Sequence, residues 1–154
     1  MGRYRILIRA HAGFSLVELI VLLVVVGALS SLSLPAFMSY NKSAQVRAAA
    51  SVIAAYLNQG RQLAIQQNQR VCVHITSTAM HYTLGSCAGS VWVGPGTDAT
   101  GNIPAPGGIA LTTTADPVFS NLGAAAPAAT VTVAHGSASL SVIVSASGRV
   151  VVGR

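Results

Sequence analysis

An apolar run near the amino terminus constrains this chain more than any other feature. Residues 14–34 consist almost entirely of Leu, Val, Ile, Ala, Gly and Ser. As an α-helix rising about 1.5 Å per residue, about 20 such residues cross a hydrocarbon core of about 30 Å. The run holds one carboxylate, Glu18. An ionised carboxylate costs on the order of 2.5–3.5 kcal/mol at the bilayer centre unless a positive partner or protonation relieves it, so a positively charged partner of Glu18 is part of the hypothesis.

The charges that flank this run predict its orientation. Arg3, Arg5 and Arg9 precede it, and short flanking segments rich in Lys and Arg stay in the cytoplasm. We therefore expect a single-pass protein whose residues after Leu34 lie on the extracytoplasmic side.

The junction Gly13-Phe14-Ser15-Leu16-Val17-Glu18 resembles the class III leader of type IV pilins and type II secretion pseudopilins. The resemblance implies cleavage after Gly13 by a prepilin peptidase, N-methylation of Phe14, and a contact of Glu18 with the α-amino group of a neighbouring subunit. It also implies residence in the bacterial inner membrane, in contact with its lipid, with the C-terminal domain in the periplasm, before entry into a pilus or pseudopilus. Ala12 departs from the pattern, since many members carry Lys or Arg there.

An ordinary secretory signal is the alternative interpretation of the same residues. Residues 3–9 would form its basic region, 14–28 its apolar region, and Ala28-Leu29-Ser30 a cleavage site. This alternative predicts a secreted, soluble DNA-binding or other binding protein that starts near Ser31. The pilin interpretation predicts a mature protein that starts at Phe14.

Composition agrees with one small exported domain on a stalk. The chain has 154 residues, 8% of them charged, and a net charge of +6, of which three charges belong to the leader arginines. The remaining charge of about +3 does not by itself indicate nucleic-acid binding. The predicted organisation is a leader at 1–13, a transmembrane segment at 14–34, an amphipathic continuation of the helix at 35–70 and an extracytoplasmic β domain at 71–154.

The helix is expected to continue beyond the apolar run, to about Asn68. Pro35 predicts a kink, but residues 36–59 contain neither Pro nor Gly. A stripe at alternating steps of four and three predicts the face that packs on a core. Its members are Val46, Ala50, Ile53, Leu57, Gly60, Ala64 and Gln67.

After Asn68 the pattern changes to short alternating segments bounded by turn residues. The predicted fold is α+β, a long N-terminal helix packed on a C-terminal antiparallel β-sandwich-like domain. The predicted strands are 71–75, 80–84, 90–93, 109–113, 117–119, 129–135, 139–145 and 149–153, with loops at 97–108 and 123–128.

Two phrases resemble the GspH/FimT branch of this superfamily. One runs from Gly60-Arg61 through Ala64-Ile65 and Asn68 to Val71, and the other is Ser147-Gly148-Arg149-Val150. The resemblance implies a minor pilin of a type IV pilus, acting with other pilin subunits in assembly, initiation or at the tip. A GspH-like minor pseudopilin of a type II secretion system is the alternative. Gly60 stands where Ala is usual.

Cys72 and Cys87 are the only cysteines. An exported domain favours a disulfide between them, and closing a loop of about 15 residues is worth about 3 kcal/mol in the chain-entropy model. A zinc site that adds His74 and His81 is the less favoured alternative. We predict no metal and no cofactor.

Neither an enzyme nor a complete DNA-binding element is indicated. The sequence lacks Gly-x-Ser-x-Gly, His-Glu-x-x-His and a phosphate loop, which predicts a non-enzyme. Some FimT-like subunits are implicated in DNA uptake through Gly-Arg-x-Arg, but Val151 replaces the second arginine here. Arg149 and Arg154 remain the candidate DNA contacts, on opposite faces if the strand is regular. Lys42, Arg61 and Arg70 would extend the basic surface.

Overall fold

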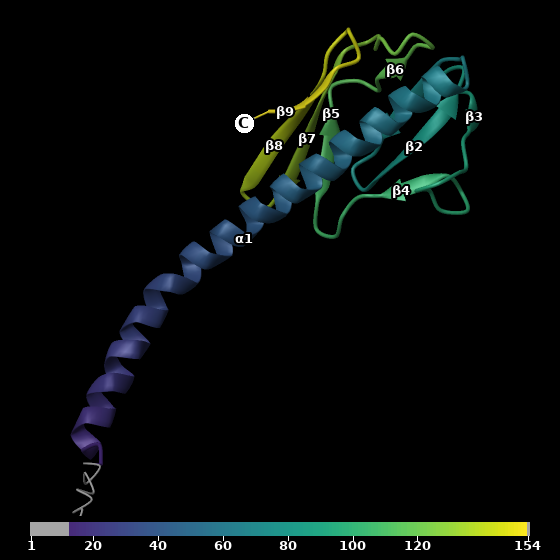
Figure 1. Cartoon of the computed structure of the whole chain (residues 1–154). Helices are drawn as coiled ribbons and strands as arrows, with labels where there is room; N and C mark the ends of the chain where they lie inside the picture. Colours follow the sequence, from purple (N-terminus) through teal and green to yellow (C-terminus); the bar gives the residue numbers. More distant parts are fainter. Residues whose placement is uncertain (1–12, 154) are drawn as a thin grey trace, which may run out of the picture. The chain divides into compact units, whose positions relative to one another are not determined.

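The computed structural model describes residues 13–153, except for the side chains of residues 32–36. The leader arginines and Arg154 lie outside the described residues. Within them the chain forms one helix, α1 (Leu16–Gln66), and nine strands. Contacts divide the chain at Met38 into two compact units. The unit Ser39–Arg154 contains both sheets and the second half of α1 (Figure 1).

The strands form two antiparallel sheets. A five-stranded sheet has the order β3-β2-β1-β6, with β4 also paired to β2, and a four-stranded sheet has the order β5-β7-β8-β9. The first contains β1 (Val71–Ile75), β2 (Ala79–Leu84), β3 (Ser90–Val91), β4 (Asn102–Pro104) and β6 (Val118–Phe119). The second contains β5 (Ala110–Thr113), β7 (Ala129–His135), β8 (Ala138–Val144) and β9 (Val150–Val152).

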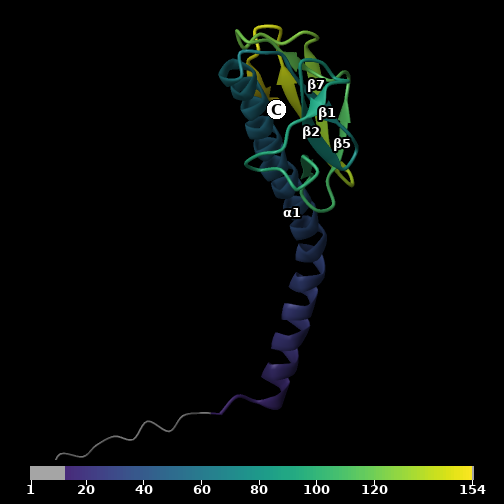
Figure 2. The same ribbon diagram turned by 90° about the vertical axis from the view of Figure 1, so that its right-hand side faces the viewer.

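The core lies between the two sheets and the part of α1 that follows Ser39, which runs alongside both sheets (Figures 1 and 2). Val46, Ala50, Ile53, Leu57 and Ala64 of the predicted stripe are all buried, and they pack with apolar side chains of both sheets. Gln67 is exposed beyond the end of the helix, so its place in the stripe was wrong. The predicted α+β fold, a long helix packed on an antiparallel β domain, is confirmed.

The helix ends at an asparagine in the left-handed conformation. Asn68 has φ of 49°, Gln69 N donates to Ala64 O at 3.2 Å, and Asn68 N donates to Ile65 O at 3.2 Å. This pair of bonds is the Schellman arrangement, in which Asn is the usual substitute for Gly. Asn121 Nδ2 also donates to Asn68 Oδ1, so the helix terminus is tied to the loop after β6.

Strand β4 corrects the prediction that residues 97–108 form an irregular loop. Asp98 Oδ1 accepts hydrogen bonds from Thr100 N, Thr100 Oγ1 and Asn102 N, at 2.7–2.8 Å. These bonds fold the turn that returns the chain to pair with β2, where Met80 is opposite Ile103. A strand of three residues is too short to show a detectable alternating pattern, and this strand depends on a turn that a side chain closes.

We predict that Asp98 makes stability depend on acid pH. The Thr100 hydroxyl, with the Asn102 amide second, holds the pKa of Asp98 below its ordinary value. Because the folded-state pKa is lowered, the carboxylate stabilises the fold above the ordinary carboxyl range near about 4, and this contribution is lost as pH falls through the folded-state value. Asp98→Asn should therefore be less stable than wild type near neutral pH, with the difference shrinking in acid.

The effect is measured by denaturant unfolding of the unit Ser39–Arg154 at a series of pH values, from neutral down to below the folded-state pKa of Asp98. Thr112→Val, at an exposed position of β5, is the control and should follow the wild-type pH profile. A constant difference between Asp98→Asn and wild type would contradict the prediction.

Gly60 is required by the close approach of α1 to the five-stranded sheet. A Cβ at Gly60 would lie 2.8 Å from Val73 Cγ2 and 3.1 Å from Tyr82 Cε1. Both neighbours are fully buried, and Tyr82 is held by a hydrogen bond from its hydroxyl to Tyr56 O at 2.8 Å. The neighbours therefore have little freedom to move away.

We predict that Gly60→Ala lowers the free energy of unfolding by about 1 kcal/mol. Overpacking costs about 1–3 kcal/mol, while Ala in place of a mid-helix Gly returns about 1 kcal/mol. Ala55→Gly, at an exposed position of α1, is the matched control and should cost about 1 kcal/mol by propensity alone. Stabilisation by Gly60→Ala in urea denaturation would show that the contact with Val73 is not tight.

Candidate functional site

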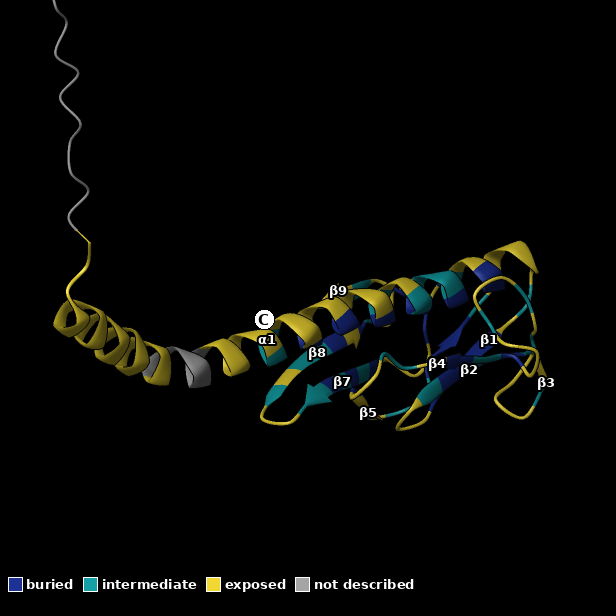
Figure 3. Cartoon of the chain, turned by 90° about the horizontal axis from the view of Figure 1, so that it is seen from below, coloured by how far each residue is buried: buried dark blue, intermediate teal, exposed yellow. Residues whose placement is uncertain are grey.

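The first half of α1 exposes its apolar side chains on every side. Large apolar residues from Leu16 to Leu29 are 50–76% exposed, and Figure 3 colours this part of the helix as exposed. They are Leu16, Val17, Leu19, Ile20, Val21, Leu22, Leu23, Val24, Val25, Val26 and Leu29. A helix that is apolar all round is normally buried in protein or lipid. This surface, called the apolar helix surface below, is therefore the first candidate for interaction.

The membrane segment expected at residues 14–34 stays a prediction. Among the residues that the structure describes, no helix combines the length and the apolar character needed to cross a membrane. Pro35 lies within α1, but its side chain is outside the described residues, so the kink also stays a prediction.

The predicted processing and assembly residues lie at the start of this surface. Gly13 and Phe14 precede the helix, and Phe14 is 75% exposed. Glu18 lies in the first turn of α1, is exposed, and forms no ion pair within the described part of the chain. Its negative charge is favourable at a helix N-terminus, and its spacing from Ser15 matches a capping box. The predicted roles of Gly13, Phe14 and Glu18 are not tested by the structure.

Arg149 lies in a turn and not on a strand. Ser145 N donates to Arg149 O at 2.9 Å and Gly148 N donates to Ser145 O at 2.8 Å, closing the turn between β8 and β9. The predicted strand start at 149 was therefore wrong, and alternation along the strand does not orient Arg149. Its side chain is exposed, while Arg154 lies outside the described residues.

The structure places Arg61 of α1 beside this turn. A Cβ at Gly148 would lie 1.7 Å from Gly123 O and 3.3 Å from Arg61 Nε. Arg61 Nε is buried and has no hydrogen-bond partner among the described residues. Sequence reasoning assigned Arg61 only to a general basic surface, because nothing local connects α1 with the Gly148-Arg149 turn.

Lys42 does not belong to the same basic surface. Its Nζ would lie 3.7 Å from a Cβ at Gly136, in the turn between β7 and β8. That turn and the Gly148-Arg149 turn lie at opposite ends of β8, which at about 3.3 Å per residue are roughly 20 Å apart. The predicted basic surface therefore does not run continuously from Lys42 to Arg149.

Cys72 and Cys87 form a disulfide that joins β1 to the loop after β2. Both sulfurs are used in the bridge, so the zinc site that combined them with His74 and His81 was wrong. No group of three or more His, Cys, Asp or Glu side chains in the described residues could hold a metal ion.

His74 and His81 instead meet a carboxylate that the sequence did not connect with them. Their ring centroids are 4.8 Å apart, and His74 Nδ1 is 2.5 Å from Asp116 Oδ2. Burial lowers the pKa of His81, neighbouring His74 adds to this, and Asp116 acts in the opposite direction. The contact between His74 and Asp116 is the only pairing of a basic with an acidic side chain within the described part of the chain.

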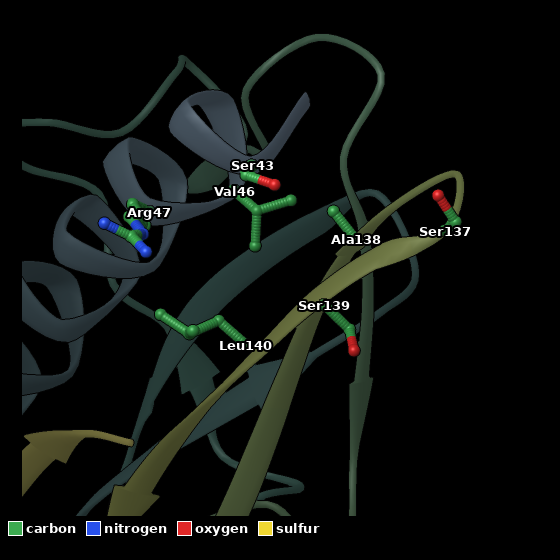
Figure 4. Close-up of a pocket in the computed structure, with 7 residues that line it drawn as sticks. All are labelled: Ser43, Val46, Arg47, Ser137, Ala138, Ser139 and Leu140. Atoms are coloured by element: carbon green, nitrogen blue, oxygen red, sulfur yellow. The ribbon is translucent and has the colours of Figure 1, made fainter. Parts of the chain in front are cut away.

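A cavity of about 320 Å³ lies between α1 and the β7–β8 hairpin (Figure 4). Leu140 projects from β8 toward the helix, whereas the Ser139 hydroxyl points to the other face of the strand. The lining is Ser43, Val46, Arg47, Ser137, Ala138, Ser139 and Leu140. With no carboxylate or histidine in this lining, the cavity offers no general base.

Comparisons with known proteins agree with this architecture. The sequence profile of the family described as type II transport protein GspH matches residues 49–148. A comparison with curated protein sequences found no significant match. The matched segment contains α1 from Ala49 to its end, His74, His81 and Gly148, whereas Val46 and Arg149 lie outside it.

Solved structures of two minor subunits have the same fold. Two crystal structures of the type IV minor pilin FimU from Pseudomonas aeruginosa match with TM-scores of 0.54 and 0.57 at 14% identity, covering 70% and 77% of this chain and 92% of FimU. The minor pseudopilin EpsH from the type 2 secretion system of Vibrio cholerae matches with a TM-score of 0.55 at 12% identity, covering 70% of this chain and 95% of EpsH.

Proposed function

The chain belongs to the GspH family of pilin-like proteins, and on this premise we propose that it is a minor pilin subunit of a type IV pilus, acting in pilus assembly or at the tip. The observation that carries the proposal is the apolar helix surface, which is uncovered in the described chain and holds a single carboxylate. Neighbouring subunits of a filament supply both an apolar cover and an amine for Glu18.

In this proposal the chain passes through two environments. Prepilin peptidase removes residues 1–13, and residues 14–34 hold the protein in the inner membrane with residues 35–154 in the periplasm. Transfer into a filament then exchanges lipid for the helices of other subunits. Because both environments are apolar, the transfer leaves Glu18 as the group whose surroundings change most.

A minor pseudopilin of a type II secretion system is the second candidate within the family. The similarity to EpsH supports it about as well as the similarity to FimU supports the pilin. Deleting the gene separates the two roles, because loss of surface pili supports the pilin and retention of secreted enzymes inside the cell supports the pseudopilin. A secreted binding protein with an ordinary signal would instead have its mature N-terminus near Ser31 and lack the apolar helix surface.

We predict that Glu18→Ala leaves the protein processed and in the membrane but lowers its incorporation into filaments by tenfold or more. The estimate follows from an unpaired amine costing on the order of 2.5 kcal/mol in an apolar helix bundle. Immunoblots of sheared filaments against the membrane fraction measure this ratio.

Two matched variants separate an ionic role of Glu18 from helix capping. Gln replaces Glu in a capping box but carries no charge. Glu18→Gln should therefore fail in incorporation as Glu18→Ala does, while Glu18→Asp should retain part of it. Full incorporation of the Gln variant would restrict Glu18 to capping and remove the proposed contact with an amine.

DNA binding is a candidate function additional to filament assembly, and it is favoured by the position of Arg61 beside the Gly148-Arg149 turn. Arg149 is exposed in this turn, Arg61 Nε lies beside Gly148, and neither arginine forms an ion pair within the described residues. Phosphate contacts from such a surface would be independent of base sequence and sensitive to salt.

We predict that Arg149→Ala weakens DNA binding uniformly across sequences and reduces the salt dependence by about one phosphate contact. Electrophoretic shift assays of the detergent-solubilised protein at several salt concentrations measure both effects. Lys42 lies in α1, beside the turn at the other end of β8. Because Lys42→Ala removes the same charge, it is the matched control. Equal effects of the two substitutions would show that binding is not localised at the Gly148-Arg149 turn.

A further inference from the structure

A row of polar side chains crosses the outer face of the five-stranded sheet. His74 of β1 is opposite His81 of β2, and His81 is opposite Asn102 of β4. Their neighbours along each strand, among them Val73 and Tyr82, are buried in the core. Because side chains alternate between faces, the two histidines point away from the core.

The two imidazoles are close enough to share a ligand. Their ring centroids are 4.8 Å apart and the ring planes are inclined by 50°. A tetrahedral ion with metal–nitrogen bonds of about 2.0–2.1 Å holds two nitrogens roughly 3.3 Å apart. Nε2 of His74, the nitrogen that does not contact Asp116, and one ring nitrogen of His81 would supply these two ligands.

Asp116 prepares His74 for such a ligand. Its Oδ2 accepts from Nδ1 of His74 at 2.5 Å, which leaves the lone pair on Nε2. Its Oδ1 accepts from Ile75 N at 3.2 Å, so the carboxylate is itself fixed to β1. Metal-bound histidines usually donate their second ring nitrogen to a carboxylate in this way.

The surroundings suit an ion that keeps bound water. The side chain of His74 is 42% exposed, so solvent reaches the pair. Asn102 Nδ2 donates to Thr100 Oγ1 at 2.9 Å, and Asn102 Oδ1 has no partner among the described residues. Imidazole nitrogens select Zn²⁺, Cu²⁺ or Ni²⁺ over Mg²⁺ and Ca²⁺, which prefer oxygen ligands.

We propose that His74 and His81 form a surface chelate for a divalent transition-metal ion, with Asp116 as the outer partner of His74 and water in the remaining positions. The ion would join β1 to β2 beside the Cys72–Cys87 disulfide and would bind only the folded hairpin. Binding would therefore stabilise the native state by RT ln(1 + c/Kd), where c is the free metal concentration, a term that rises with c.

Zinc titration of the untagged, full-length protein in detergent, after treatment with a chelator, tests the proposal. Calorimetry should show one Zn²⁺ per chain, and His74→Gln and His81→Gln should each abolish binding. Asp116→Asn should keep the stoichiometry and weaken affinity by about 10–100-fold, the usual effect of losing an outer partner. His135 is the last residue of β7, in the other sheet, and His135→Gln should leave binding unchanged.

An NMR measurement on the wild-type protein covers the case of variants that fail to fold. Zn²⁺ should shift the imidazole proton resonances of His74 and His81 together and leave those of His135 in place. Binding that survives His81→Gln, resonances that do not respond, or saturation reached only above millimolar zinc would each overturn the proposal.

Discussion

The packing of α1 against both sheets is the interaction on which the rest of the folded domain depends. Val46, Ile53 and Leu57 bury completely against side chains of both sheets, and Gly60 permits the backbone to approach Val73 and Tyr82. Within the described chain, α1 is the only helix that can pack on the two sheets. Asn68, at the end of the helix, is bonded to Asn121 in the loop after β6, and the disulfide joins Cys72 of β1 to Cys87 in the loop after β2. Both links hold the chain where it passes from α1 into β1.

One helix serves two purposes because its composition changes along its length. From Val46 onward one stripe is buried, while the exposed side mixes polar residues with Val52 and Ile65. A single buried stripe is typical of a helix that belongs to a globular core. Between Leu16 and Leu29 apolar residues occupy every side, and the large ones are at least half exposed. The same helix therefore carries a core-forming part and a part whose apolar side chains are exposed.

Agreement between sequence and structure was best where the signal was local. The span of α1 was predicted to within two residues, and β1 and β7 have the predicted bounds, because periodicity and turn residues act over a few positions. Strand β4 was missed because a turn at Asp98 and pairing with β2 create it. The sequence grouped His74 with His81 only in the zinc alternative. Asp116 lies 42 positions from His74, and no local pattern links the two.

By itself the sequence determined the long helix, its apolar and amphipathic halves, and the family. These features depend on composition and spacing along a continuous stretch, where sequence distance and spatial distance agree. Only the tertiary structure decided that Arg61 meets the Gly148-Arg149 turn, that Lys42 does not, and that Asp116 orients His74. These contacts join segments far apart in the chain, and packing of the sheets on α1 brings them together.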